Sequence, residues 1–219
     1  MVFFTPADVK PPAGHKQSLK EIADYAEAFF SKWMKHWGYK CHKPLNIARD
    51  KKGFPEILYF KGKGDKNSGE YSVKYAQQTI VPALKSKYNL STRQVLWLFA
   101  FPGAERSFRG MGKAHKGGLA VANFTAVKES LKTSDSMTSD VAQKLQLKGL
   151  IHELGHGLGL PHIGPLKEDK LGNSLMGPIV KAYKKMAPEE SRVYLTKASA
   201  AMLWRHPLFS PTTQKVTDT

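Results

Sequence analysis

Residues 152–162 decide the fold of this 219-residue chain, and they read His152-Glu153-Leu154-Gly155-His156-Gly157-Leu158-Gly159-Leu160-Pro161-His162. His152 and His156 are four residues apart, so on a helix both imidazoles project from one face and can bind one metal ion. Gly159 stands where that helix would end, because a residue without a Cβ adopts the left-handed conformation easily. The chain can then turn back, so that His162 approaches the ion from a loop as the third ligand.

Three neutral imidazoles leave the fourth position of a zinc ion open to water, which is the arrangement of a catalytic site rather than a structural one. We assign Glu153 to the bound water and not to the metal, since a carboxylate nearby can take the proton of a water whose pKa the cation lowers. Glu153 would act first as general base and then as general acid to the leaving amine. The alternative, three histidines satisfied by ordinary hydrogen bonds, leaves the joint presence of Glu153 and Gly159 unexplained.

Residues 152–162 match the signature H-E-x-x-H-x-x-G-x-x-H, and the chain therefore resembles the metzincins, a clan of zinc-dependent endopeptidases. That family also has a tight turn, the Met-turn, whose methionine packs beneath the metal, and residues 174–177 are similar to it. The sequence Met176-Gly177-Pro178 is most similar to the matrixin-like branch. The resemblance implies a zinc-dependent endopeptidase with one zinc ion, in which Met176 supports the site.

The resemblance also implies an α+β fold of the metzincin-like zincin type, formed by one catalytic domain over residues 1–219. An N-terminal subdomain, about residues 1–159, would contain a twisted mixed β-sheet, helices and the active-site helix. A smaller C-terminal subdomain, residues 160–219, would contain the Met-turn and the C-terminal helix. The active-site cleft between the two would bind an extended peptide, with Gly118–Phe124 as the cleft-edge strand that pairs with it.

Hydrophobic periodicity and turn residues predict the remaining elements. A helix over about Ser18–Trp37 has a capping-box pattern, Ser18 with Glu21, and Gly38 as its stop. The other predicted elements are two strands, Leu45–Arg49 and Pro55–Phe60, that suggest a hairpin, a helix at Tyr71–Tyr88 interrupted at Pro82, a buried strand at Gln94–Phe101, and helices at about Ser139–Leu158 and Pro188–Trp204.

The composition limits the class of protein. The chain is 41% hydrophobic and has four Trp and eleven Phe, enough for a packed interior. Its single cysteine, Cys41, excludes an intramolecular disulfide and any Cys-rich metal site, and we favour an inert thiol over an inhibitory metal ligand. No stretch approaches the roughly 20 apolar residues of a membrane span, and the first residues lack the features of a signal peptide. We expect a monomer without a membrane span, secreted or otherwise extracytoplasmic, whose leader is not visible in the chain.

The net charge of +16 favours anionic partners. However, the charge is spread along the chain, and the cations are 28 lysines and 6 arginines, whereas nucleic-acid readout favours the rigid fork of arginine. We therefore expect a solvated lysine-rich surface and a protein or peptide substrate, with nucleic acid disfavoured. Two alternative functions stay open: a zinc-containing binding protein that does not cleave peptides, and a basic nucleic-acid-binding protein.

Two further side chains are weaker candidates for the site. Tyr183 lies seven residues past Met176 and could donate its phenol to the zinc-bound oxyanion, although a packed or exposed tyrosine is the favoured alternative. His115 follows a stretch loosely similar to the matrixin segment that holds a structural zinc. Since no Asp and His partners are recognisable beside it, we disfavour a second zinc ion.

Overall fold

The structure of the protein, a computed structural model, describes residues 1–41, 43–91, 94–101, 109–113, 116–124, 126–127, 141–166, 171–177 and 193–209. These residues form a mixed α+β fold with a mostly parallel sheet and several helices. The predicted α+β class is thereby confirmed. Within the described ranges, no helix is both long enough and apolar enough to cross a lipid bilayer.

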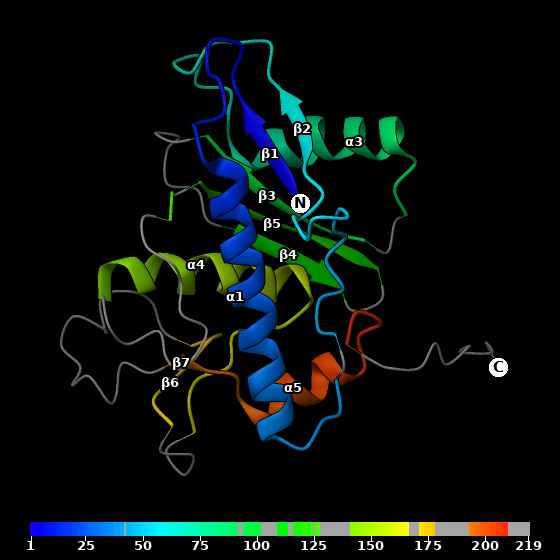
Figure 1. Ribbon diagram of the computed structural model, residues 1–219, viewed down its shortest axis with the longest axis vertical. Helices are drawn as coiled ribbons and strands as arrows, with labels where there is room; N and C mark the ends of the chain where they lie inside the picture. Colours follow the sequence, from blue (N-terminus) through cyan, green and yellow to red (C-terminus); the bar gives the residue numbers. More distant parts are fainter. Residues whose placement is uncertain are drawn as a thin grey trace.

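A five-stranded sheet forms the upper half of the molecule in Figure 1. In spatial order the strands are β2 (Leu58–Lys61), β1 (Val2–Thr5), β3 (Val95–Ala100), β5 (Gly117–Asn123) and β4 (Arg109–Lys113). The first four are parallel, and β4 pairs antiparallel with β5, with Gly110 opposite Ala120. The prediction that Gly118–Phe124 is the edge strand is therefore wrong: β5 lies between β3 and β4, and β4 forms the edge.

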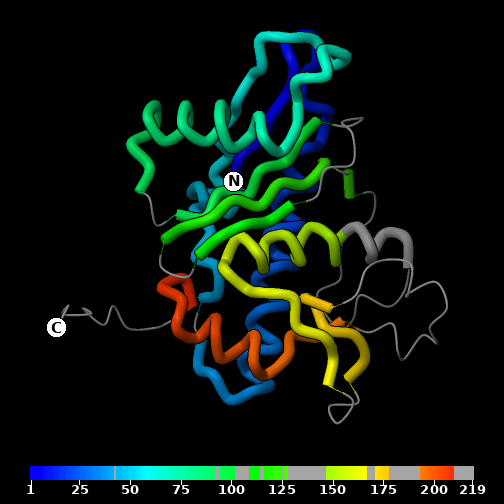
Figure 2. The backbone as a smooth tube through the Cα atoms, turned by 180° about the vertical axis from the view of Figure 1, so that it is seen from behind, coloured from blue at the N-terminus to red at the C-terminus, as the bar shows by residue number. Residues whose placement is uncertain are grey.

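Helices cover both faces of this sheet, as Figures 1 and 2 show. One face packs against α1 (His15–His36) and α4 (Val141–Gly157), and its strand residues are Phe3, Trp97, Phe99, Ala120 and Ala122. The other face packs against α3 (Val81–Tyr88) and the residues before it, and its strand residues are Val2, Phe4, Leu96, Leu98, Ala100, Leu119 and Val121. Strand β1 buries side chains on both faces, which requires the continuous apolar run found there.

Helix α1 extends from the sheet to the opposite end of the molecule (Figure 1). It begins after Gly14, which has φ 74°, so Ser18 lies inside the helix and the predicted capping box is wrong. The buried hydroxyl of Ser18 instead accepts a hydrogen bond from the backbone N–H of Val127 at 3.1 Å. The predicted stop is confirmed, because the helix ends at His36 and Gly38 adopts φ 81°.

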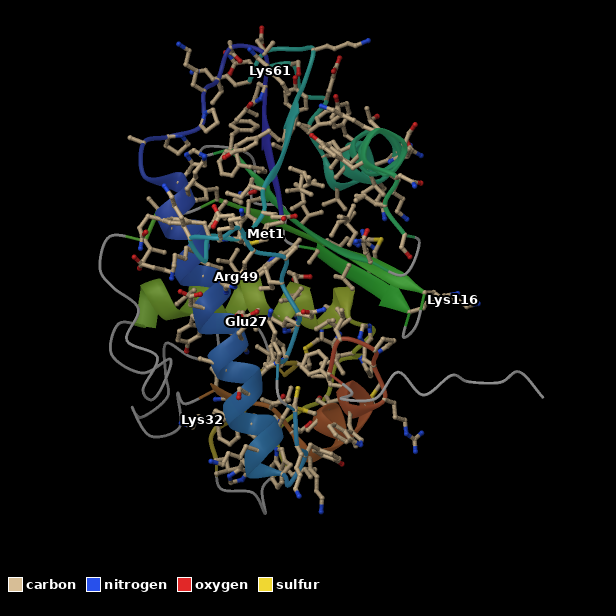
Figure 3. The ribbon with its side chains drawn as sticks, turned by 45° about the vertical axis from the view of Figure 1, so that its right-hand side comes forward. Met1, Glu27, Lys32, Arg49, Lys61 and Lys116 are labelled. Carbon is tan, nitrogen blue, oxygen red and sulfur yellow. The ribbon has the colours of Figure 1, made fainter. Side chains whose placement is uncertain are left out.

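The predicted hairpin between α1 and β2 is confirmed only next to its turn. An isolated antiparallel bridge joins Arg49 and Pro55, and the Glu56 N–H donates to the Ala48 carbonyl at 2.8 Å, but strand β2 pairs in parallel with β1. The Arg49 guanidinium lies 2.8 Å from the carboxylates of Asp24 and Glu27, two residues one turn apart on α1. Figure 3 shows Arg49 beside Glu27 on the surface of α1. These two ion contacts hold the segment around Arg49 against α1.

The helical segment predicted over Tyr71–Tyr88 continues through Pro82 without a break, but it contains an irregular turn directly before this proline. It consists of α2 (Val73–Tyr75), a π-helical turn η1 (Ala76–Ile80) and α3, and Pro82 stands in the first turn of α3. A proline ring clashes with the carbonyl four residues earlier in a regular helix and lacks an N–H to donate. The wider π turn directly before it accommodates both effects without ending the helix.

The elements that follow α4 lie on its far side from α3 (Figure 2). They are a parallel pair of short strands, β6 (Asn173–Ser174) and β7 (Val193–Tyr194), and helix α5 (Lys197–Trp204). The predicted helix Pro188–Trp204 is therefore shorter than expected, because residues 193–194 are extended; residues 188–192 lie outside the described ranges. The Trp37 indole N–H donates to the Leu195 carbonyl at 2.7 Å, which ties this region to α1.

Candidate metal centre

Helix α4 packs one apolar face into the main hydrophobic core, and this packing fixes its position. The buried residues of this face and of the residue after the helix are Leu147, Leu150, Ile151, Leu154 and Leu158. The helix ends as the sequence predicts: Gly159 has φ 87°, its N–H donates to the His156 carbonyl at 2.9 Å, and Leu160 N–H donates to the Gly155 carbonyl at 2.9 Å. This pair of bonds is a Schellman motif, and it turns the chain back beneath the helix.

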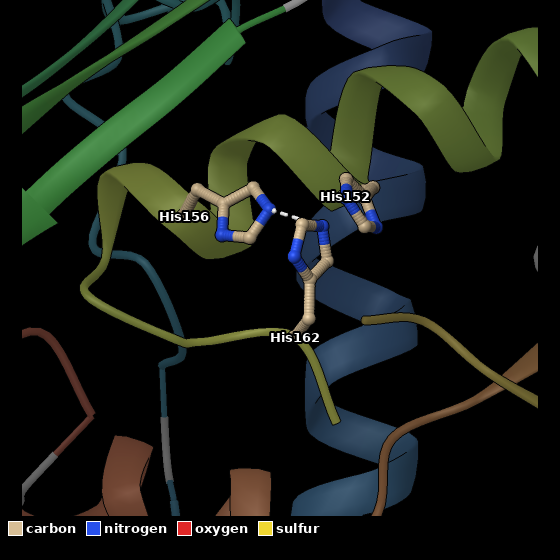
Figure 4. Close-up of side chains that lie close together, drawn as sticks. All are labelled: His152, His156 and His162. Carbon is tan, nitrogen blue, oxygen red and sulfur yellow. Dashed lines mark hydrogen bonds between the residues drawn. The ribbon is translucent and has the colours of Figure 1, made fainter. Parts of the chain in front are cut away.

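The turn brings His162 to the side chains of His152 and His156 (Figure 4). One ligand atom from each ring lies within 4.8 Å of the other two, and the Nε2 atoms of His156 and His162 are 3.1 Å apart. Two nitrogens bound to one tetrahedral zinc ion at about 2.0 Å each would stand about 3.3 Å apart, so the observed spacing suits a single ion. This group could hold a metal ion. Within the described part of the chain it is the only cluster of three or more His, Cys, Asp or Glu side chains with such spacing.

Backbone carbonyls fix the tautomers of the two helical histidines. The Nδ1 of His152 lies 2.7 Å from the Leu175 carbonyl oxygen, and the Nδ1 of His156 lies 2.7 Å from the Leu160 carbonyl oxygen. Because a carbonyl only accepts, each Nδ1 must carry the proton and each Nε2 is left with its lone pair. Histidines that bind metals in proteins are commonly held in this way.

Burial and neighbouring charge keep His152 neutral. Its pKa is lowered from 6.5 to about 4, chiefly by burial; the hydrogen bond to Leu175 opposes this shift, and the charges of His156, Lys148 and His162 contribute to it. Lys148 lies one helical turn before His152 and is itself buried, which lowers the pKa of its ammonium to about 8. A metal binds only the neutral imidazole, so this environment prepares the histidine for a cation.

Glu153 lies beside the histidines and faces the edge strand. Burial raises the pKa of its carboxyl, and three features oppose that effect: the backbone N–H of Gly110, which donates to the carboxylate, and the charges of His162 and Arg109. The glutamate therefore has a hydrogen bond that orients it and a partly desolvated site that makes it a stronger base.

Strand β4 lies directly on the backbone of α4. A Cβ placed on Gly110 would stand 1.9 Å from the Glu153 carbonyl oxygen, and one on Gly112 would stand 2.0 Å from that of Gly157. On β5, a Cβ on Gly118 would also stand 1.9 Å from the Gly157 oxygen. Glycine is required at these three positions because the backbones of β4 and β5 approach the backbone of α4 closely. Strand β4 and its packing on α4 are not predicted from the sequence, although the alternation of glycines at 110 and 112 is a signal that indicates them.

Met176 lies in a tight turn beneath the helix. Gly177 N–H donates to the Ser174 carbonyl at 3.0 Å, which closes the turn, and Met176 is 1% exposed. The Met176 carbonyl accepts a hydrogen bond from Ile163 N–H at 3.1 Å, next to the third histidine. The same turn supplies the Leu175 carbonyl that holds His152. The structure thus brings Met176 and the three histidines together.

The structure does not place the remaining candidates from the sequence at this site. Tyr183, His115 and Pro178 are outside the described residues. Cys41 is partly buried and packs against the main hydrophobic core, and burial is the chief cause that raises the pKa of its thiol. A thiol with a raised pKa is a poor metal ligand and nucleophile, in agreement with the inert role favoured for Cys41.

Comparison with known proteins shows a similar fold. No known protein family and no curated protein matches this sequence. Crystal structures of wild-type OgpA from Akkermansia muciniphila match with a TM-score of 0.71 at 22% identity over 96% of this chain and 61% of OgpA, and with 0.74 at 22% over 98% and 62%. Catalytically inactive OgpA in complex with an O-glycopeptide (glycodrosocin) substrate matches with a TM-score of 0.72 at 21% identity, over 97% of this chain and 61% of OgpA. The chain thus spans about three fifths of the length of the solved chains that it matches.

Proposed function

We propose that the protein is a zinc-dependent endopeptidase of the metzincin type. In this proposal His152, His156 and His162 bind one zinc ion, Glu153 is the general base and acid, and Met176 supports the site. The observation that carries the proposal is the convergence of three imidazoles whose free nitrogens face one point, with Glu153 on the same turn of α4.

The donor set fits zinc better than the other common metals of proteins. Three neutral imidazoles suit zinc, whereas magnesium and calcium prefer oxygen ligands. No fourth His, Cys, Asp or Glu of the described residues joins the cluster, which is the ligand set expected of a catalytic rather than a structural ion. When bound, zinc would polarise the scissile carbonyl and lower the pKa of the attacking water.

Glu153 moves the protons in this mechanism. Its carboxylate takes a proton from the attacking water and then delivers it to the nitrogen of the leaving amine. The hydrogen bond from Gly110 N–H orients the carboxylate, and burial raises its pKa, which makes it a stronger proton acceptor.

The free edge of β4 supports a peptide-binding cleft next to Glu153. Among the described residues, β4 pairs on one side only, with β5, so its other side has backbone groups available to an added strand. We propose one catalytic domain, with a cleft between an N-terminal subdomain (about 1–159) and a C-terminal subdomain (160–219). Substrate would lie in this cleft as a strand beside β4, in place of the β5 pairing expected from the sequence.

Several finer assignments belong to the same proposal. The substrate would be a protein or peptide, and because similar OgpA was solved with an O-glycopeptide, glycosylated peptides are one class to test. Like the family it resembles, the protein would act as a monomer outside the cytoplasm. The matrixin-like branch and the oxyanion role of Tyr183 stay predictions from the sequence.

The test is digestion of a peptide library by purified protein, with matched O-glycosylated and unglycosylated members. We expect cleavage that a chelator abolishes, that added zinc restores and that Glu153→Gln lacks. Stoichiometric zinc without any cleavage would favour the non-proteolytic binding protein instead. Retention of DNA or RNA at physiological salt, with no cleavage, would favour the nucleic-acid-binding alternative.

A further inference from the structure

The two faces of β4 have different chemistry. Gly110 and Gly112 face α4, since any side chain there would overlap the helix backbone. Side chains of a strand alternate between faces, so Arg109, Met111 and Lys113 must point to the opposite face. In agreement, the Met111 sulfur contacts the Gln77 side-chain amide of η1, on the side of the sheet covered by α3.

That opposite face is positively charged. Arg109 and Lys113 are both exposed. Residues 71–127 contain eight lysines and arginines and a single acidic residue, Glu105, which lies outside the described ranges. Lys116 extends this charge at the turn between β4 and β5, where Figure 3 shows it at the end of the two strands. The described residues of this stretch contain no carboxylate, although the charge of Arg109 also acts on Glu153 of α4.

A peptide added to the free edge of β4 would meet this charge at every second residue. Neighbouring strands lie about 4.8 Å apart, and side chains directly opposite each other have Cβ atoms about 5 Å apart. One set of peptide side chains would lie over α4 and the histidines. The alternate set would lie beside Arg109, Met111 and Lys113.

We propose that Arg109 and Lys113 select substrates with carboxylate side chains, Asp or Glu, on the face of the bound peptide that points away from the histidines. The two cations are four residues apart, so they would contact two acidic residues at the same spacing in the peptide. This selectivity rests on the proposed pairing of substrate with β4. Opposite charges across two strands improve binding by about 1.5- to 5-fold for each pair, and salt weakens the effect.

The experiment uses a fluorescent peptide of otherwise neutral sequence with two Glu residues four apart, and moves this pair along the sequence one residue at a time. Binding is measured by anisotropy with the Glu153→Gln variant, and cleavage with the wild-type protein, at low and high salt. We expect affinity to rise and fall with a period of two residues. Peptides with Gln in place of Glu should show no such alternation.

Matched variants separate local recognition from net charge. Arg109→Gln and Lys113→Gln should each lower the preference by about 1.5- to 5-fold. Lys16→Gln removes the same charge from α1 near the opposite sheet edge, since the adjacent His15 hydrogen-bonds Tyr59 of β2, and it should change nothing. Equal affinity at all positions, absence of peptide binding, or the same loss in Lys16→Gln would overturn the inference. Alternating affinity without wild-type cleavage would contradict only the proposed peptidase activity.

Discussion

Met176 lies against Gly155 in the turn of α4 that carries the proposed metal ligands: a Cβ on Gly155 would stand 2.6 Å from the Met176 sulfur. Gly155 is flanked by His152 and Glu153 on one side and His156 on the other. The turn that contains Met176 therefore limits how closely α4 can approach it at Gly155. It also holds His152 directly through the Leu175 carbonyl.

Gly155→Ala should weaken metal binding more than it weakens folding. Alanine improves helix propensity by about 1 kcal/mol, but overlap with the buried Met176 costs about 1–3 kcal/mol, since either the Met176 side chain or the helix must shift. We expect a lower zinc affinity by competition with a chromogenic chelator, with a small change in the free energy of unfolding. Gly164→Ala is the matched control, because a Cβ there meets nothing within 4 Å. Equal zinc affinity in both variants would show that Met176 does not set the site.

Glu153→Gln should keep the fold and the metal but lose about 10²–10⁴-fold in kcat, because the amide cannot accept the proton of the attacking water. Peptide cleavage under saturating substrate measures this loss. Glu70→Gln, which removes a carboxylate from an exposed position, is the control and should retain activity. Unchanged cleavage by the Glu153 variant would remove this residue from the mechanism.

Gly110→Ala should lower both stability and turnover. The new methyl would overlap the Glu153 carbonyl, so β4 or α4 must move, at a cost of about 1–3 kcal/mol in the free energy of unfolding. Gly112→Ala makes a similar overlap at Gly157, one turn beyond Glu153. We expect the two variants to lose similar stability by urea denaturation and Gly110→Ala to lose more kcat. The opposite order of kcat losses would show that Gly110 does not position the glutamate.

The metal-free protein should lose stability as pH falls from about 6.5 to about 4. Burial lowers the pKa of His152 from 6.5 to about 4, so over this interval the unfolded chain binds a proton that the folded state excludes. The contribution is fully present above pH 6.5, and acid should release bound metal for the same reason. Urea denaturation of chelator-treated protein at several pH values tests this. Replacement of His152 by Gln should flatten the dependence over this interval, and an unchanged slope would contradict the account.

The sequence predicts those features whose determinants lie close together in the chain. The spacing of His152 and His156 predicts the histidine face of α4, and the position of Gly159 predicts its Schellman end. The buried face of α1 is also predicted from residues close together in the chain: Ile22, Phe29 and Trp33 recur at helical spacing, and all three are buried.

The missed features depend on partners far away in the chain. Strand β1 is a short apolar run without alternation, and its neighbours β2 and β3 begin at Leu58 and Val95. Ser18 reads as a helix cap, but its hydroxyl meets Val127 instead. Strand β4 contains two glycines and therefore has a weak strand propensity, and only the proximity of α4 explains them.

Elemental analysis of metal content is the most direct test of zinc binding by His152, His156 and His162. The protein is stripped with a chelator, equilibrated with zinc and desalted, together with two variants: His156→Ala, and His36→Ala at the exposed end of α1. We expect one zinc ion per chain in the wild type and in His36→Ala, and none in His156→Ala. A wild-type protein without stoichiometric zinc, or a His156→Ala variant that retains it, would contradict three-histidine binding and the proposed activity with it.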